Sequence, residues 1–195
     1  MALGGGTFLV QNKDLPGAYI NFVSAASASA TLSERGIATM PLELDWGIAG
    51  EVFEVTNGDF QKNSMELFGY EYTSEKLKGL RDLFIHAKTL YAYRLNGEGT
   101  KAANSYAKAR YPGIRGNELK TVIQINADDE SLFDVKTLLG TTVVDEQTVS
   151  DATGLNANKY VTWNLDTTLE VTAGVPFTGG ENGETNGAAY QKYLD

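Results

Sequence analysis

The sequence contains no cysteine, only one histidine, His86, and four prolines in 195 residues. Without cysteine the chain cannot form a disulfide, a thiolate nucleophile, a cysteine-ligated zinc site or an iron–sulfur cluster. With one histidine it cannot build a multi-histidine metal site, and a Ser-His-Asp triad would have to use His86. These absences remove most of the catalytic repertoire, so we expect no enzyme, no cofactor and no metal.

Long apolar runs and an excess of basic residues are also missing. The longest apolar runs are far shorter than the ~20 residues that a spanning helix needs. The first residues carry no basic n-region, so we expect neither a secretory signal nor membrane insertion. The 16 Lys and Arg against 25 Asp and Glu give a net charge of −9, which argues against a nucleic-acid binder because phosphate contacts need a basic face.

Residues 1–24 are expected to form an extended N-terminal arm. The arm contains a glycine hinge and two strand-like apolar stretches separated by a turn, and the residues concerned are Gly4, Gly5 and Gly6 for the hinge and Phe8, Leu9, Val10, Tyr19, Ile20 and Phe22 for the strands. Such strands either form an edge of the molecule's own sheet or add to a sheet of a neighbouring molecule. Composition alone favours the first interpretation.

Residues 25–95 have the pattern of a mixed α/β segment. Two helices are expected, Phe60–Phe68 after capping oxygens in 57–59, and Glu75–Lys88 after the cap Ser74. His86 lies near the end of the second helix, where a histidine is typically a surface residue favoured by the helix dipole. The strands expected here are 36–40, 41–46, 50–55 and 91–95.

Residues 96–180 are expected to form a β-rich inserted domain, because short strands alternate with Gly, Pro and Asn turns. The strands expected are 102–109, 119–125, 132–138, 142–149, 160–163 and 168–171. Residues 181–195 have the pattern of a linker and the start of a C-terminal domain that the chain lacks. The fold class expected is therefore α+β: a mixed α/β portion with an arm, then a β-rich sandwich or barrel-like domain.

Charge is unevenly distributed along the β-rich part. Residues 96–124 hold five basic groups against two acidic ones, and residues 125–195 hold three against twelve. The basic stretch is a candidate charged interface or a solvated face, with Lys108, Arg110, Arg115 and Lys120 as its members. Asp128, Asp129, Glu130 and Asp134 supply oxygens that a hard cation prefers, but their spacing matches no EF-hand and favours an acidic turn.

Three stretches together resemble the tail sheath proteins of contractile-tailed bacteriophages and phage-tail-like bacteriocins of Gram-positive bacteria. They are the opening from Gly4 to Phe22, the stretch Ala109–Leu119 with its Pro-Gly and Gly-Asn pairs, and Leu169–Gly180. Each motif alone is weak, but their order and spacing are fairly specific. The resemblance covers the whole chain.

The resemblance implies a subunit that polymerises as stacked hexameric rings around a tail tube and contracts to drive the tube through a cell envelope. It implies that Phe8, Leu9 and Val10 donate a strand to a neighbouring subunit, with the tube protein and baseplate as further partners. The particle would be a virion tail or tail-like particle assembled in the bacterial cytoplasm. Family members are longer, so we expect this chain to be a truncated N-terminal portion that does not polymerise alone. The alternative is a β-rich module that binds carbohydrate or protein.

Overall fold

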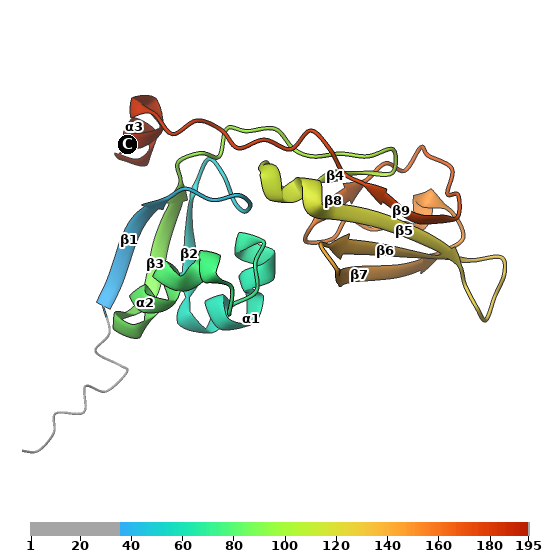
Figure 1. Ribbon diagram of the computed structural model, residues 1–195, viewed down its shortest axis with the longest axis horizontal. Helices are drawn as coiled ribbons and strands as arrows, with labels where there is room; N and C mark the ends of the chain where they lie inside the picture. The colour runs from blue at the N-terminus through green and yellow to red at the C-terminus, as the bar shows by residue number, and fades with distance from the viewer. Residues whose placement is uncertain (1–35, 195) are drawn as a thin grey trace, which may run out of the picture. The chain divides into compact units, whose positions relative to one another are not determined.

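A computed structural model describes residues 36–194, which form three sheets and three α-helices (Figure 1). The predicted arm residues, from the hinge Gly4–Gly6 to Phe22, lie outside the described residues. We call residues 36–95 the α/β lobe and residues 97–182 the β-rich lobe.

The α/β lobe is a three-stranded sheet with two helices packed on one face. The strand order is β1-β3-β2, with β1 parallel and β2 antiparallel to β3. Phe53, Leu90 and Ala92 alternate onto the covered face and pack with helical side chains in one buried cluster. The elements are β1 (Gly36–Leu42), β2 (Val52–Thr56), α1 (Asn57–Phe68), a 3₁₀ turn (Glu75–Leu77), α2 (Lys78–His86) and β3 (Ala87–Arg94).

Side-chain caps start α1 and the 3₁₀ turn that leads into α2, whereas α2 itself has no side-chain cap. The cap of α1 is Thr56, whose Oγ1 accepts a hydrogen bond from the Asp59 amide at 3.1 Å, so the helix starts three residues earlier than predicted. Gly69, with φ of 76°, ends α1 in the left-handed conformation that glycine tolerates. The predicted cap Ser74 is confirmed, since its Oγ accepts from the Lys76 amide at 3.3 Å. His86 is exposed at the last position of α2.

The β-rich lobe packs a four-stranded antiparallel sheet, ordered β7-β6-β5-β9, with the two-stranded pair β4-β8. Leu119, Ile123 and Val135 from the large sheet and Val161 from the small one are buried in one cluster. The strands are β4 (Ala107–Ala109), β5 (Leu119–Ile125), β6 (Phe133–Leu139), β7 (Thr142–Val149), β8 (Val161–Trp163) and β9 (Thr172–Pro176). The predicted α+β class, with a sandwich-like β domain, is confirmed.

Four predicted strands are wrong in extent or place. The strand expected at 91–95 begins at Ala87, because α2 ends at His86, two residues before the helix end expected at Lys88. The strand expected at 41–46 does not form separately, because β1 runs through to Leu42 and bends follow. Of the stretch 102–109 only β4 is a strand. The strand expected at 168–171 forms four residues later as β9, which contains Gly174 at a φ of 151°. A helix, α3 (Gly187–Leu194), lies in the stretch expected to be a linker and the start of a further domain. The predicted domain boundaries stay predictions.

Candidate functional site

Two antiparallel segments connect the lobes, one leaving the α/β lobe and one returning to it. Gly183 donates its amide hydrogen to the Asn96 carbonyl at 2.9 Å, and Thr100 and Glu181 exchange amide–carbonyl bonds at 3.0 and 3.1 Å. A Cβ on Gly99 would lie 1.9 Å from the Glu181 carbonyl oxygen, so glycine is needed for this close approach. We call residues 96–100 and 179–183 the neck.

Arg94, the last residue of β3, is buried at the base of the neck with 1% of its surface exposed. Its Nε donates to Asn96 Oδ1 at 3.1 Å, and its Nη1 donates to the Pro112 carbonyl at 2.8 Å and the Gly47 carbonyl at 3.2 Å. Its Nη2 donates to Asn182 Oδ1 at 3.4 Å. Burial lowers the pKa of Arg94 to about 10, which still leaves the guanidinium charged at neutral pH. One side chain thus binds four chain segments.

Asp45 is the acidic side chain of the same site, and it shares Asn182 with Arg94 as a hydrogen-bond partner. Its Oδ1 accepts from Asn182 Nδ2 at 2.9 Å and its Oδ2 accepts from the Tyr70 hydroxyl at 2.7 Å. Burial works against ionisation of Asp45, but these hydrogen bonds, with Lys76 and Arg94 nearby, lower the pKa of its carboxyl. Burial and the bond to Asp45 raise the pKa of Tyr70 to about 12, so Tyr70 remains a neutral donor.

Trp46 provides the apolar part of the same connection. It belongs to the α/β lobe but is fully buried within the core cluster of the β-rich lobe. Its ring meets Tyr111 edge-on at 5.4 Å between centroids and stacks on Tyr160 at 6.3 Å. Its Nε1 donates to the Glu66 carbonyl at 3.0 Å, so the buried indole leaves no donor unpaired. We call the contacts of Asp45, Trp46, Arg94 and Asn182 the junction.

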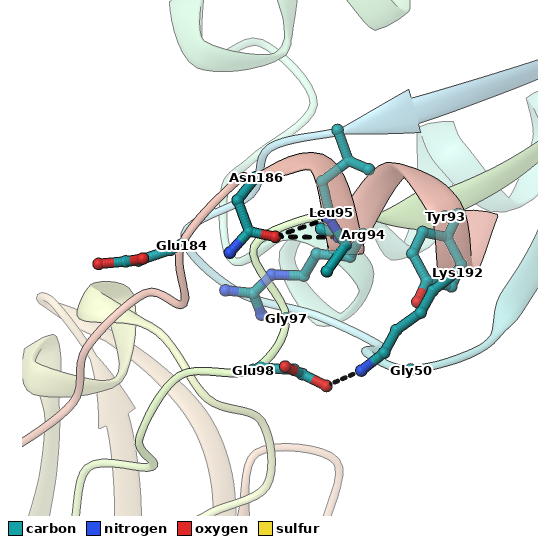
Figure 2. A pocket seen from close by; sticks show the side chains of 11 residues that line it. Gly50, Tyr93, Arg94, Leu95, Gly97, Glu98, Glu184, Asn186 and Lys192 are labelled. Carbon is teal, nitrogen blue, oxygen red and sulfur yellow. Dashed lines mark hydrogen bonds and ion pairs between the residues drawn. The ribbon is translucent and has the colours of Figure 1, made fainter.

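A cavity of about 480 Å³ lies beside the junction, between the end of β3 and α3 (Figure 2). Figure 2 shows Lys192 of α3 reaching Glu98, with which it forms an ion pair. Asn186 caps α3 by accepting from the Ala188 and Ala189 amides at 3.0 and 3.1 Å. The cavity is lined by mixed charges and backbone rather than by a nucleophile with a base, so its arrangement supports no particular chemistry.

The predicted acidic stretch forms a turn held by its own side chains. Asn126 Oδ1 accepts from the amides of Asp128 and Asp129 at 3.0 Å, and Asp134 accepts from Asn126 Nδ2 at 2.9 Å. These are turn contacts, as the spacing predicted. Across residues 36–194, no group of three His, Asp or Glu side chains is arranged to hold a metal. None of the helices in that range is long and apolar enough to cross a membrane.

Two family models match the chain in succession and meet at the neck. The model "Tail sheath protein Gp18 domain III N-terminal region" matches residues 35–95, and the model "Phage tail sheath protein beta-sandwich domain" matches residues 97–182. The chain belongs to the phage tail sheath proteins. The α/β lobe therefore corresponds to the first sheath model and the β-rich lobe to the second.

Curated and solved relatives agree with this assignment. The phage-like element PBSX protein XkdK of Bacillus subtilis is 34% identical over 185 residues, 92% of this sheath chain and 38% of the relative. The solved sheath tail protein of Desulfitobacterium hafniense shares 40% identity at a TM-score of 0.74, over 91% of this chain and 42% of that one. The solved sheath tail protein of Listeria innocua shares 29% identity at a TM-score of 0.72, over 83% and 37%. The chain thus spans about two fifths of the length of these relatives.

The four members of the predicted charged interface lie on different elements of the β-rich lobe. Lys108 in β4, Arg110 just after it and Lys120 in β5 are exposed. Arg115, whose side chain is 14% exposed, instead joins the lobes: its Nε donates to the Gly69 carbonyl at 2.7 Å, and it forms an ion pair with a nearby glutamate. The structure thus separates three surface cations from one that is used within the molecule.

The junction was missed by the sequence prediction. One signal for it is present, because Arg94 interrupts the apolar run Tyr91–Leu95, and a charged residue inside a buried strand needs partners. The sequence contains no comparable signal for the residues that Arg94 and Asp45 contact. Asp45 and Asn182 lie 137 positions apart in the chain, and only the fold brings them together.

Proposed function

We propose that this chain is part of a contractile tail sheath, whose subunits stack as hexameric rings around a tail tube and drive it through a target cell envelope. The observation that carries the proposal is the order of two sheath models on two lobes joined by one neck. The partners proposed are neighbouring sheath subunits, the tube protein and the baseplate. The place proposed is a phage or phage-tail-like particle assembled in the bacterial cytoplasm.

Contraction of such a sheath requires no catalytic group. The free energy lies in the difference between two sets of subunit contacts, so that each interface has two discrete arrangements. The role proposed for the chain is therefore to present surfaces and to transmit displacement. A nucleophile, a cofactor or a metal has no part in this function.

The arm is the proposed link between subunits. Phe8, Leu9 and Val10, with the stretch from Tyr19 to Phe22, would add a strand to a sheet of a neighbouring subunit, where main-chain hydrogen bonds supply the affinity. The hinge Gly4–Gly6 would let the arm change direction while this pairing persists. The link would then survive the large displacement between the extended and contracted lattices.

The exposed cations of the β-rich lobe are the proposed charged contact with acidic surface of another subunit. Lys108, Arg110 and Lys120 are available for it, because their side chains are exposed. Opposite charges across an interface act mainly on the rate and register of association. Salt should therefore slow assembly more than it weakens the finished sheath.

Labelled electron microscopy of particles from the bacterium that encodes the chain tests the proposed function. An epitope tag is inserted in the exposed turn after Ala127, in the chromosomal copy, and particles are stained with gold-conjugated antibody. We expect gold along the whole length of the sheath, and none in the untagged strain. Gold confined to the particle tip would instead support the binding-module alternative, and particles without gold would overturn both.

A further inference from the structure

The junction combines a buried cation with a buried aromatic ring. Among the ion pairs of residues 36–194 none includes Arg94, so neutral carbonyl and amide oxygens bind most of its donors. These oxygens are fixed in the α/β lobe, in the β-rich lobe and in both segments of the neck. A buried guanidinium that loses such partners retains the full cost of its desolvation.

We propose that the junction holds the two lobes together as one rigid, cooperative unit. Arg94 is the positioning residue, and Trp46 is the apolar side chain that fills the contact. Separation of the lobes would expose Trp46, which is now fully buried, and would remove the Pro112 and Asn182 oxygens from Arg94. Both costs arise in the same step.

Backbone contacts across the junction leave little room for sliding. The Arg115 amide donates to the Asp45 carbonyl at 3.2 Å. A Cβ on Gly113, where φ is 130°, would lie 2.1 Å from the same carbonyl oxygen. The Ile114 amide donates to Asn182 Oδ1 at 3.2 Å. Close-packed contacts of this kind have discrete rather than continuous arrangements.

What this coupling of the lobes would do in an assembled sheath rests on the proposed function. The coupling would then hold the β-rich lobe in one orientation on the α/β lobe within each subunit. The mechanical coupling itself is a property of the isolated chain. It can therefore be tested without any particle, so that its failure and the failure of the proposed function are distinguishable.

The test uses the whole 195-residue chain with Trp163→Phe, which leaves Trp46 as the one tryptophan of the sequence. Urea unfolding is followed by Trp46 emission, which reports on the junction, and by far-UV circular dichroism, which reports on the sheets. We expect one midpoint for both signals. Coincident transitions from different probes are the mark of a single cooperative unit.

Arg94→Met should separate the two signals. Trp46 emission is expected to shift to the red at a lower urea concentration than the dichroism changes, with the opening equilibrium raised about tenfold or more, because several charge-assisted hydrogen bonds are lost. The matched control is Arg81→Met. Arg81 donates to the Tyr72 and Ser74 carbonyls at 2.6 and 2.5 Å within the α/β lobe, so its loss should move both signals together.

Two results would overturn the proposal: separate midpoints without any junction mutation, or an unchanged common midpoint in Arg94→Met. If Arg94→Met does not fold, Asn182→Ala takes its place, because it removes one acceptor of Arg94 and one donor to Asp45. It should separate the signals by a smaller amount in the same direction. Coincident, unshifted signals in Asn182→Ala would count against the proposal equally.

Discussion

Arg94 Nη1 lies 2.8 Å from the carbonyl oxygen of Pro112, a residue of the other lobe. The same nitrogen donates to the Gly47 carbonyl at 3.2 Å, so one guanidinium nitrogen connects a loop of each lobe. Proline has no amide hydrogen of its own, but its carbonyl is a full acceptor. The Pro112-Gly113 pair therefore contributes an acceptor and a close approach at the same point.

Gly113→Ala should destabilise the chain strongly. At φ of 130° and ψ of 160° an alanine is strained, and its Cβ would be 2.1 Å from the Asp45 carbonyl oxygen. We expect a loss on the order of 3 kcal/mol in the free energy of unfolding, measured by urea titration. The control is Gly79→Ala within α2, where nothing lies within 4 Å of the added Cβ and a gain of about 0.5–1 kcal/mol is expected. Equal effects at the two sites would contradict the role given to Gly113.

Charge reversal should distinguish Arg110 from Arg115, which the sequence placed in the same candidate charged interface. Arg115→Glu should cost about 2–3 kcal/mol of folding stability, because it removes a hydrogen bond to Gly69 and places a carboxylate beside Glu118. Arg110→Glu, at an exposed site, should change the stability by less than about 0.5 kcal/mol. Thermal unfolding of the isolated chain measures both.

Charge reversal at the exposed cations also tests the proposed charged contact. In particles, Arg110→Glu should slow or prevent sheath assembly while leaving the chain folded, and Lys108→Glu and Lys120→Glu should act alike. Electron microscopy of the particles is the measurement. Normal sheaths in all three variants would remove the charged contact from the proposal.

The junction should lose stability in acid but not near neutral pH. The pKa of Asp45 is lowered in the folded chain, so its contribution to stability is fully present above the ordinary carboxyl pKa of about 4 and is lost as the pH falls through the folded value. The groups facing it are Tyr70, Lys76, Arg94 and Asn182; burial raises the pKa of Tyr70 to about 12 and lowers that of Arg94 to about 10, both far above this acid range.

Trp46 emission in the Trp163→Phe background measures this acid effect. The urea midpoint should be constant from about pH 7 to pH 5 and should fall below about pH 4. Asp45→Asn retains an acceptor but cannot titrate, so it should flatten the dependence of the Trp46 signal. An unchanged acid slope in Asp45→Asn would show that other carboxyls govern the opening.

Leu9→Pro tests strand donation by the arm. Proline lacks the amide hydrogen that a paired strand donates, so it should prevent addition to a neighbouring sheet. We expect particles with absent or fragmented sheaths, while the unfolding midpoint of the isolated chain stays unchanged. Leu3→Pro, before the glycine hinge, is the matched control. Intact sheaths in Leu9→Pro particles would end the proposal for the arm.

Local patterns predicted much of the fold because local chemistry determines it. The limits of β5 and β7 agree with the prediction, since Gly116, Asn117 and Gly140 interrupt regular alternation beside them. β9 was misplaced because the expected strand ended at Val171, before Gly174. In the structure it lies inside the strand, where an added Cβ would be 2.6 Å from Lys120 Cδ. In sequence, a glycine that leaves room for a side chain of the neighbouring strand cannot be distinguished from a glycine that a turn requires.

The junction could not be predicted in this way because its contacts are distant in the chain. Trp46 has the alternation of a strand in sequence, yet it leaves its own lobe to fill the core of the other. The resemblance to sheath proteins predicted the family, which the comparisons show. It did not predict which residues join the lobes, since that depends on the pairing of segments rather than on any motif.

The 2.9 Å bond between the Gly183 amide and the Asn96 carbonyl means that the polypeptide leaves and re-enters the α/β lobe at one point. A foreign protein whose own termini are adjacent could be spliced between these residues in place of the β-rich lobe, giving a particle decorated with repeated cargo. The replacement would have to bring a carbonyl for Arg94 and a cover for Trp46. It would also have to replace the donor that Asn182 gives to Asp45 and the bond from Arg115 to the Gly69 carbonyl, so such a graft depends on the junction contacts rather than on linker length.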